Sequence, residues 1–156
     1  MDKYYLKFNS TIGEFTLVQS SDNFITNVSI TSIDVSGLTL KETELLIQAK
    51  TEICEYLKGL RKEFTVPFKQ ETTPFQKKVY DVLAEIPYGY KLTYSDIAYL
   101  IGKEGGSRAV GNALGRNNIL LLVPCHRVVG KTSLGGFSSG LKVKEQLLKL
   151  EKSLEL

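Results

Sequence analysis

The feature that most constrains the fold of this chain is a pair of short helical segments joined by a glycine-containing turn. "TYSDIAYLIG" covers residues 93–102, and Thr93 followed by Asp96 resembles the capping box that begins many helices. "KEGG" is a short turn, and "SRAVGNALGRNN" is a further helical stretch that Ser107 could cap. Two such helices predict a helix-turn-helix. Many helical hairpins bind no DNA, so spacing alone leaves DNA binding open.

Further helices are expected on both sides of this pair. The text from "PFQKKVYDVLAEI" onward predicts one from an apolar stripe, and "PYGYK" then reads as a turn. The chain closes with "LKVKEQLLKLEKSLEL", a last helix whose apolar residues should point mostly inward. The residues of the first stripe are Phe75, Val79, Val82, Leu83 and Ile86, and those of the last helix are Leu141, Val143, Leu147, Leu148 and Leu150.

The first half of the chain has a different pattern. β-Branched and aromatic residues occur in short runs that are broken by "STIG" and "SSDN", a pattern typical of a small antiparallel meander. "KETELLIQAKTEICEYLKGL" then predicts a helix that Gly59 ends, with Cys54 on its buried stripe. "KEFTVPF" would add a strand or a connector. We therefore predict an α+β protein. Residues 1–69 would form a small N-terminal antiparallel β-sheet plus a helix, and residues 70–156 a mostly helical C-terminal domain with the helix-turn-helix.

Composition sets limits on location and partners. The N-terminus has no apolar segment typical of a secretory signal, and the longest apolar run, Ile119–Val123, is too short to span a bilayer. Two cysteines without a CxxC or a histidine cluster predict neither a metal site nor a disulfide framework, and favour the cytoplasm. Residues 1–70 hold 8 basic and 9 acidic side chains, whereas residues 71–156 hold 12 and 8. A basic C-terminal half favours a polyanion such as DNA, although a solvated surface explains it equally well.

"LLVPCHRVVG" holds the only histidine of the chain, His126, directly after Cys125. An imidazole near a thiol lowers the thiol pKa and so supplies the nucleophilic thiolate, usually with a third group that orients the ring. Adjacent residues of an extended strand point in opposite directions, so a bridging water or a bend would have to link the two. From this pair alone, a buried structural cysteine is the commoner outcome.

The same residues carry a resemblance. "VPCHRVVG", with "SRAVGNALGRNN" before it and "LGGFSSGLKVKEQLLKLE" after it, resembles the O6-alkylguanine-DNA alkyltransferase family, also called methylated-DNA–protein-cysteine methyltransferases. "TPFQKKVYDVLAEIPYGYKLTYSDIA" is similar to the family upstream, and the match covers roughly residues 56–151. The resemblance implies direct-reversal DNA repair. A methyl or alkyl group would pass from O6-alkylguanine in double-stranded DNA to the protein, once per molecule, irreversibly and without a cofactor.

The resemblance also implies roles for particular residues. Cys125 would be the nucleophile, His126 a base acting through a water, and Glu151 the group that orients His126. Tyr94 would donate a hydrogen bond to the base and aid departure of the guanine anion. The pocket for the base would include Val128, Phe137, Ser138 and Asn117: the backbone N–H of Ser138 would reach O6, the carbonyls of Cys125 and Val128 would accept the exocyclic amine, and Asn117 would be a hinge.

The implied DNA contacts centre on the helix after the turn, which would lie in the minor groove. Arg108 would enter the base stack in place of the flipped nucleotide. Small residues on this helix would permit close approach to DNA. The full predicted DNA-binding set is Arg108, Ala109, Gly111, Asn112, Ala113, Thr93 and Ser95. We expect a monomer that acts in the cytoplasm.

Three departures from the family pattern accompany this resemblance. Asn117 is followed by Asn118 where the family usually has proline, which could loosen the hinge. The segment between Cys125 and Phe137 is one residue shorter than usual, which affects the assignment of Ser138. Phe137 also stands where tyrosine is common.

Two other classes of function compete with alkyl transfer. A DNA-binding module without chemistry, either a regulator or a lesion sensor, would not need Cys125. A cysteine hydrolase normally brings together a cysteine and a histidine that are distant in the sequence, whereas His126 adjoins Cys125.

Overall fold

The computed structural model describes residues 2–153, which divide into two compact units. The first comprises residues 2–70 and 118–120, and the second comprises residues 71–117 and 121–153. The predicted domain boundary, between residues 69 and 70, lies beside this division. That the two units are independent domains stays a prediction. Among the described residues, no helix is long and apolar enough to cross a membrane.

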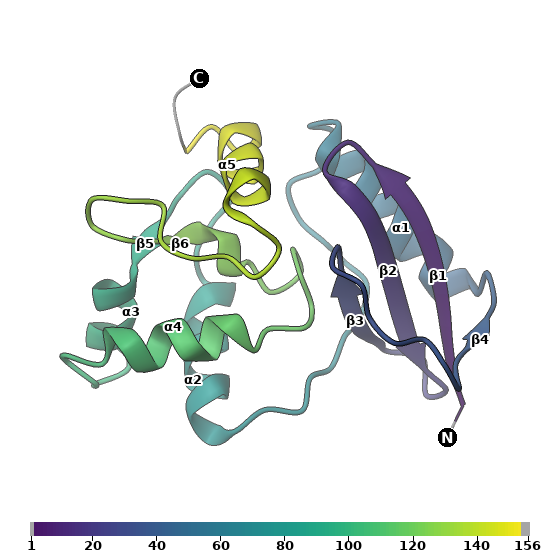
Figure 1. Cartoon of the computed structure of the whole chain (residues 1–156), viewed down its shortest axis with the longest axis horizontal. Helices are drawn as coiled ribbons and strands as arrows, with labels where there is room; N and C mark the ends of the chain where they lie inside the picture. The colour runs from purple at the N-terminus through teal and green to yellow at the C-terminus, as the bar shows by residue number, and fades with distance from the viewer. Residues whose placement is uncertain (1, 154–156) are drawn as a thin grey trace. The chain divides into compact units, whose positions relative to one another are not determined.

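The first unit is a four-stranded sheet with one helix against it (Figure 1). The strands are β1 (Lys3–Ser10), β2 (Gly13–Ser20), β3 (Ile25–Ser29) and β4 (Thr39–Leu40), in the order β3-β2-β1-β4. Strands β1 to β3 form the predicted antiparallel meander. The prediction of a wholly antiparallel sheet was wrong at its edge, because β4 pairs with β1 in parallel. A two-residue, exposed strand carries no alternating pattern that could reveal it.

Helix α1 (Glu44–Leu57) covers the sheet through the expected apolar stripe. It ends as predicted, with Gly59 in the left-handed region at φ +75°. Cys54, expected on the buried stripe, is only half-buried, and Glu52 is buried instead. The Glu52 carboxylate accepts hydrogen bonds from the backbone N–H and the hydroxyl of Thr65. These hydrogen bonds offset the cost of removing the carboxylate from water, so Glu52 can be buried although it is charged.

Two connecting segments also pair with β3 in this unit. The backbone N–H of Ile25 donates to the Pro67 carbonyl, and its carbonyl accepts from the Lys69 N–H. The segment "KEFTVPF" therefore contributes an isolated β-bridge rather than a full strand. The second segment is 118–120, where the backbone of Val28 exchanges hydrogen bonds with Asn118 and Leu120. Residues 118–120, which follow the predicted helix-turn-helix in the sequence, therefore belong to the first unit.

The second unit contains four helices and a minimal two-stranded sheet. The helices are α2 (Pro74–Ala84), α3 (Tyr94–Leu100), α4 (Ser107–Gly115) and α5 (Leu141–Leu150). Strands β5 (Leu92–Thr93) and β6 (Val128–Val129) pair in parallel, and a single 3-10 turn, η1 (Cys125–Arg127), leads directly into β6. In Figure 1, α4 lies beside both α2 and α3, the arrangement expected of a helix-turn-helix.

Local signals at the helix starts were mostly correct. The capping box at α3 is formed, because Thr93 Oγ1 accepts from the Asp96 N–H and the Asp96 carboxylate accepts from the Thr93 N–H. The prediction that Ser107 caps α4 was wrong, since Ser107 is the first helical residue and Gly106 is the cap. A Cβ at Gly106 would lie 2.7 Å from the carbonyl oxygen of Lys103, so the tight turn requires glycine there.

The inward face of α5 also differs from the prediction. Leu147 and Leu148 are buried, but Leu141 is exposed and Val143 and Leu150 are only half-buried. Lys144 is fully buried in their place. A positive charge inside a small unit needs partners, and these are found in the pocket described next.

Candidate active site

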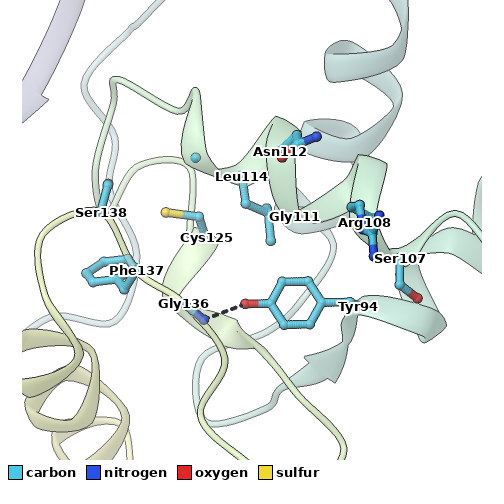
Figure 2. Close-up of a pocket in the computed structure, with 11 residues that line it drawn as sticks. Tyr94, Ser107, Arg108, Gly111, Asn112, Leu114, Cys125, Gly136, Phe137 and Ser138 are labelled. Atoms are coloured by element: carbon cyan, nitrogen blue, oxygen red, sulfur yellow. Dashed lines mark hydrogen bonds between the residues drawn. The ribbon is translucent and has the colours of Figure 1, made fainter.

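The second unit contains a pocket of about 590 Å³ with Cys125 in its wall. The volume is in the range of sites that bind small molecules. Helices α3 and α4, the turn η1 and the loop of residues 130–140 supply its walls, and Figure 2 shows the sulfur of Cys125 directed toward the loop. The lining residues are Tyr94, Ser107, Arg108, Gly111, Asn112, Leu114, Gly115, Cys125, Gly136, Phe137 and Ser138.

Cys125 is held at the pocket wall by its neighbours. Its backbone N–H donates to the Val123 carbonyl at 2.8 Å, and the Asn117 amide donates to Sγ at 3.2 Å. Only 6% of the residue is exposed, and this burial raises the thiol pKa, although the Asn117 hydrogen bond and the charge of Lys144 oppose it. The predicted lowering of this pKa by His126 was therefore wrong. The resting residue is a thiol, and a base must take its proton before it can react.

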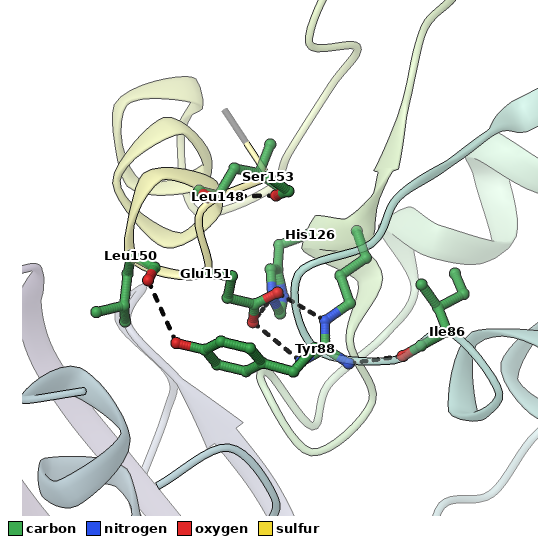
Figure 3. Close-up of polar contacts among 8 residues, drawn as sticks. Ile86, Tyr88, His126, Leu148, Leu150, Glu151 and Ser153 are labelled. Atoms are coloured by element: carbon green, nitrogen blue, oxygen red, sulfur yellow. Dashed lines mark hydrogen bonds and ion pairs between the residues drawn. The ribbon is translucent and has the colours of Figure 1, made fainter. Parts of the chain in front are cut away.

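His126 lies in a buried ionic network that the turn η1 makes possible. Its Nε2 lies 2.8 Å from Oε2 of Glu151, and both residues are only 1% exposed (Figure 3). Arg127 binds the same carboxylate through Nε and Nη2, at 2.8 and 3.0 Å, and donates its third bond to the Ile86 carbonyl. The predicted pairing of Glu151 with His126 is thus present in the structure, and Arg127 holds the carboxylate in place.

The hydrogen bonds of this network determine which nitrogen of the His126 ring carries the proton. Nε2 faces a carboxylate and therefore carries the ring proton, which leaves the lone pair on Nδ1. Nδ1 is buried and has no hydrogen-bond partner among residues 2–153. Burial lowers the pKa of His126, and the attraction of Glu151 only partly offsets it. A neutral ring with an unpaired acceptor can take up a proton or bind a water molecule.

Tyr94 contacts the opposite wall of the pocket. Its hydroxyl oxygen accepts a hydrogen bond of 2.9 Å from the Gly136 N–H, so its own proton can still be donated (Figure 2). The neighbouring Gly135 has φ +76°, and a Cβ there would lie 2.3 Å from the Tyr94 oxygen. Glycine at 135 therefore lets the loop approach the ring closely.

The pocket collects seven of the predicted site residues, namely Tyr94, Arg108, Gly111, Asn112, Cys125, Phe137 and Ser138. Asn117 contacts Cys125 from beside the pocket. Val128 has a buried side chain, and its carbonyl accepts from Lys144 at 2.6 Å. His126 and Glu151 lie in the buried network described above.

The other predicted DNA-binding residues lie elsewhere on α3 and α4. Ala109 is exposed, whereas Ala113 is only 3% exposed; both line a smaller hollow beside α2. The Thr93 hydroxyl serves the capping box and lies 3.2 Å from that of Ser95. Ala113 therefore has little surface to offer to a partner.

Two buried residues of the site, Arg127 and Lys144, were missed by the sequence analysis. A signal for Lys144 existed in the sequence. Positions 144, 147, 148 and 151 follow the i, i+3, i+4, i+7 spacing of one helix face, so the buried face of α5 includes both Lys144 and Glu151. Among the described residues, no three His, Cys, Asp or Glu side chains gather as metal ligands would.

Comparison with known proteins defines the class of protein. The model of the 6-O-methylguanine DNA methyltransferase DNA-binding domain matches residues 74–153, which hold the helix-turn-helix, Cys125 and the buried network. The chain belongs to the methylated-DNA–protein-cysteine methyltransferase family.

Individual relatives extend the match to the first unit. The constitutive methylated-DNA–protein-cysteine methyltransferase of Bacillus subtilis is 39% identical, over 96% of this chain and 95% of its own. That of Methanosarcina acetivorans is 42% identical, over 96% and 99%. A crystal structure of Mycobacterium tuberculosis OGT in complex with DNA has a TM-score of 0.89 and 36% identity, over 96% and 93%. These matches confirm the predicted family and α+β fold.

Proposed function

We propose that this chain repairs DNA by moving a methyl or alkyl group from O6 of guanine in a duplex to its own Cys125. The observation that carries the proposal is the sulfur of Cys125 in the wall of a pocket that α4 also lines, with a neutral His126 next to it in the chain. The family relatives are named as cysteine methyltransferases that act on methylated DNA. A nucleophile, a base and a cavity at one place fit that chemistry.

The reaction begins with removal of the thiol proton. Nδ1 of His126 takes it through a bridging water, and Glu151 stabilises the imidazolium that forms. The thiolate attacks the alkyl carbon, a C–S bond forms, and the C–O bond breaks with its electron pair leaving on the guanine. Tyr94 donates a hydrogen bond to the departing base. The product is a thioether, which has no easy leaving group, so each molecule reacts once and needs no cofactor.

Binding of the base uses the backbone around the pocket. The Ser138 N–H would donate to O6, and the carbonyls of Cys125 and Val128 would accept from the exocyclic amine. A carbonyl oxygen has two lone pairs, so Val128 can serve the base and Lys144 together. Phe137 lines the same wall and offers an apolar face to the ring. Asn117 would be the hinge beside Cys125.

The guanine must leave the duplex before it can reach Cys125. Unpairing and unstacking cost a few kcal/mol, which an inserted side chain can offset. Arg108 would fill the vacated stack while the base enters, and its exposure on α4 at the pocket supports this role. Ala109, Gly111 and Asn112 would follow the minor groove, with Ala113 buried behind them, and Thr93 and Ser95 would contact the backbone at the start of α3.

We also propose that the protein acts as a monomer in the cytoplasm. Cys54 and Cys125 are both free thiols, which suits a reducing compartment.

Intact mass spectrometry tests the proposal. The chain is mixed with a duplex carrying one O6-methylguanine, and we expect a mass gain of one methyl group per chain. Cys54→Ser should gain the methyl and Cys125→Ala should not. Binding of the duplex without a mass gain would instead make the chain a lesion-binding module, and the proposal would be wrong.

A further inference from the structure

The mechanism above gives no role to the buried ammonium of Lys144, which lies beside the pocket of Cys125. It is fully buried on α5, and Nζ donates to the carbonyls of Val128 at 2.6 Å and Gly136 at 3.0 Å. No carboxylate lies within ion-pair distance of it in residues 2–153. Burial of a cation costs free energy unless the cation is well paired. We therefore ask what the ammonium of Lys144 does at this position.

The two carbonyls belong to different walls of the pocket. Val128 begins β6, directly after the turn that holds Cys125, whereas Gly136 lies in the loop of residues 130–140. One ammonium therefore ties the segment of the nucleophile to the loop that faces it. Through Tyr94, the loop is also tied to α3, because Gly136 donates its N–H to the Tyr94 oxygen. Gly136 is thus held at both its N–H and its carbonyl.

The charge of Lys144 also acts on its neighbours. Cys125 and His126 on η1 and the Tyr94 ring on α3 face it, with Nζ 5.9 Å from the ring centroid. The ammonium favours the thiolate of Cys125 and disfavours protonation of His126. The first effect assists a step in which the thiol loses a proton, whereas the second makes His126 a weaker base for that proton.

We propose that Lys144 is a positioning residue of alkyl transfer: its ammonium clamps the loop of residues 130–140 onto the Cys125 segment and favours the Cys125 thiolate. This rests on the proposed function for its role in transfer, but the clamp itself requires no substrate. Burial lowers the pKa of Lys144 to about 8, with Cys125 acting in the opposite direction. The charge is present below that pH and is lost as pH rises through it, so the clamp should weaken in mildly alkaline solution.

The clamp is tested first in the unsubstituted chain by NMR, without DNA. The amide N–H groups of Val129 and Phe137 follow the two carbonyls that Lys144 binds. We expect both amide signals to shift with one common midpoint, near pH 8. Amide shifts that show no common midpoint would overturn the clamp. This readout stands even if a substituted chain fails to fold, and even if no methyl transfer is found.

The effect on chemistry is tested with Lys144→Met, which removes the charge and both donors at similar length. Lys149→Met on the same helix is the control, since Lys149 is partly exposed and pairs with Glu145. Both are made in a Cys54→Ser background so that one thiol remains. We expect Lys144→Met to lower the rate of iodoacetamide reaction at pH 7.5 about tenfold, which corresponds to a thiol pKa one unit higher. Methyl transfer should slow at least as much, with the affinity for an unmodified duplex unchanged.

The two arms of this test have distinct readings. Iodoacetamide and transfer rates equal to those of Lys149→Met would overturn the role of Lys144. A fall in the iodoacetamide rate with no methyl transfer by the unsubstituted chain would support the charge effect while the proposed function fails.

Discussion

The Asn117 side chain joins two points of the active-site segment: Nδ2 donates to Sγ of Cys125 at 3.2 Å and to the Val123 carbonyl at 3.0 Å. A donor aimed at sulfur favours the thiolate over the thiol. It therefore opposes the effect of burial, which otherwise holds the thiol pKa high. The predicted hinge residue thus acts directly on the nucleophile.

Replacement of Asn117 by alanine should make Cys125 less reactive. The lost hydrogen bond to a charged sulfur is worth about 1.5–3 kcal/mol, so iodoacetamide should react with Cys125 at least about tenfold more slowly. Asn118→Ala is the matched control, because Asn118 is exposed and its side chain accepts from the Gln70 amide. Equal rates for the two variants would mean that the bond to sulfur has no effect on ionisation.

The buried imidazole predicts a pH dependence of stability. The pKa of His126 is lowered in the folded chain, so below the unfolded value of about 6.5 the unfolded state binds a proton that the folded state does not. The free energy of unfolding should therefore fall as pH drops below about 6.5, by up to about 1.4 kcal/mol per pH unit. Urea unfolding at several pH values measures this. His126→Gln should flatten the dependence between pH 5 and 6.5, since the chain has one histidine; an unchanged slope would contradict the assignment.

Substitution of the exposed arginines at the two ends of α4, Arg108 and Arg116, distinguishes an effect on base flipping from an effect on the transfer step. Arg108→Ala should slow methyl transfer from a duplex much more than benzyl transfer from free O6-benzylguanine, because only the duplex requires a filler for the vacated stack. Arg116→Ala removes an equal charge from an exposed position outside the pocket of Cys125 and serves as the control. Rate constants from quenched-flow mixing decide the matter. Equal slowing with both substrates would argue against insertion into the stack.

The loop near Tyr94 should tolerate little change at Gly135. Gly135→Ala would place Cβ 2.3 Å from the Tyr94 oxygen at a φ of +76°, so we expect a loss of about 1–3 kcal/mol and slower transfer. At Gly136 a Cβ would meet nothing within 4 Å, so Gly136→Ala should change stability much less. Thermal unfolding of both variants gives the comparison, and equal losses would show that the contact with Tyr94 does not limit the loop.

Short-range sequence patterns predicted where helices begin and end, but they did not predict the pKa shifts and buried charges of the site. The Thr93–Asp96 capping box and the Gly59 helix end depend on neighbours a few residues away, so the sequence pattern was sufficient. Cys125 and His126 were found because they are adjacent. The raised thiol pKa could not be predicted, because burial depends on how distant segments pack. The helical spacing places Lys144 on the buried face, but its carbonyl partners lie 16 and 8 residues away and depend on the same packing.

The most direct test of the central claim counts methyl groups. The chain is titrated with a growing excess of duplex carrying O6-methylguanine with a deuterated methyl, and the label is located by peptide mass spectrometry. Capture by a single sulfur predicts a plateau of one methyl per chain, all of it on the peptide that holds Cys125. Continued turnover beyond one methyl, or label on any other residue, would contradict it.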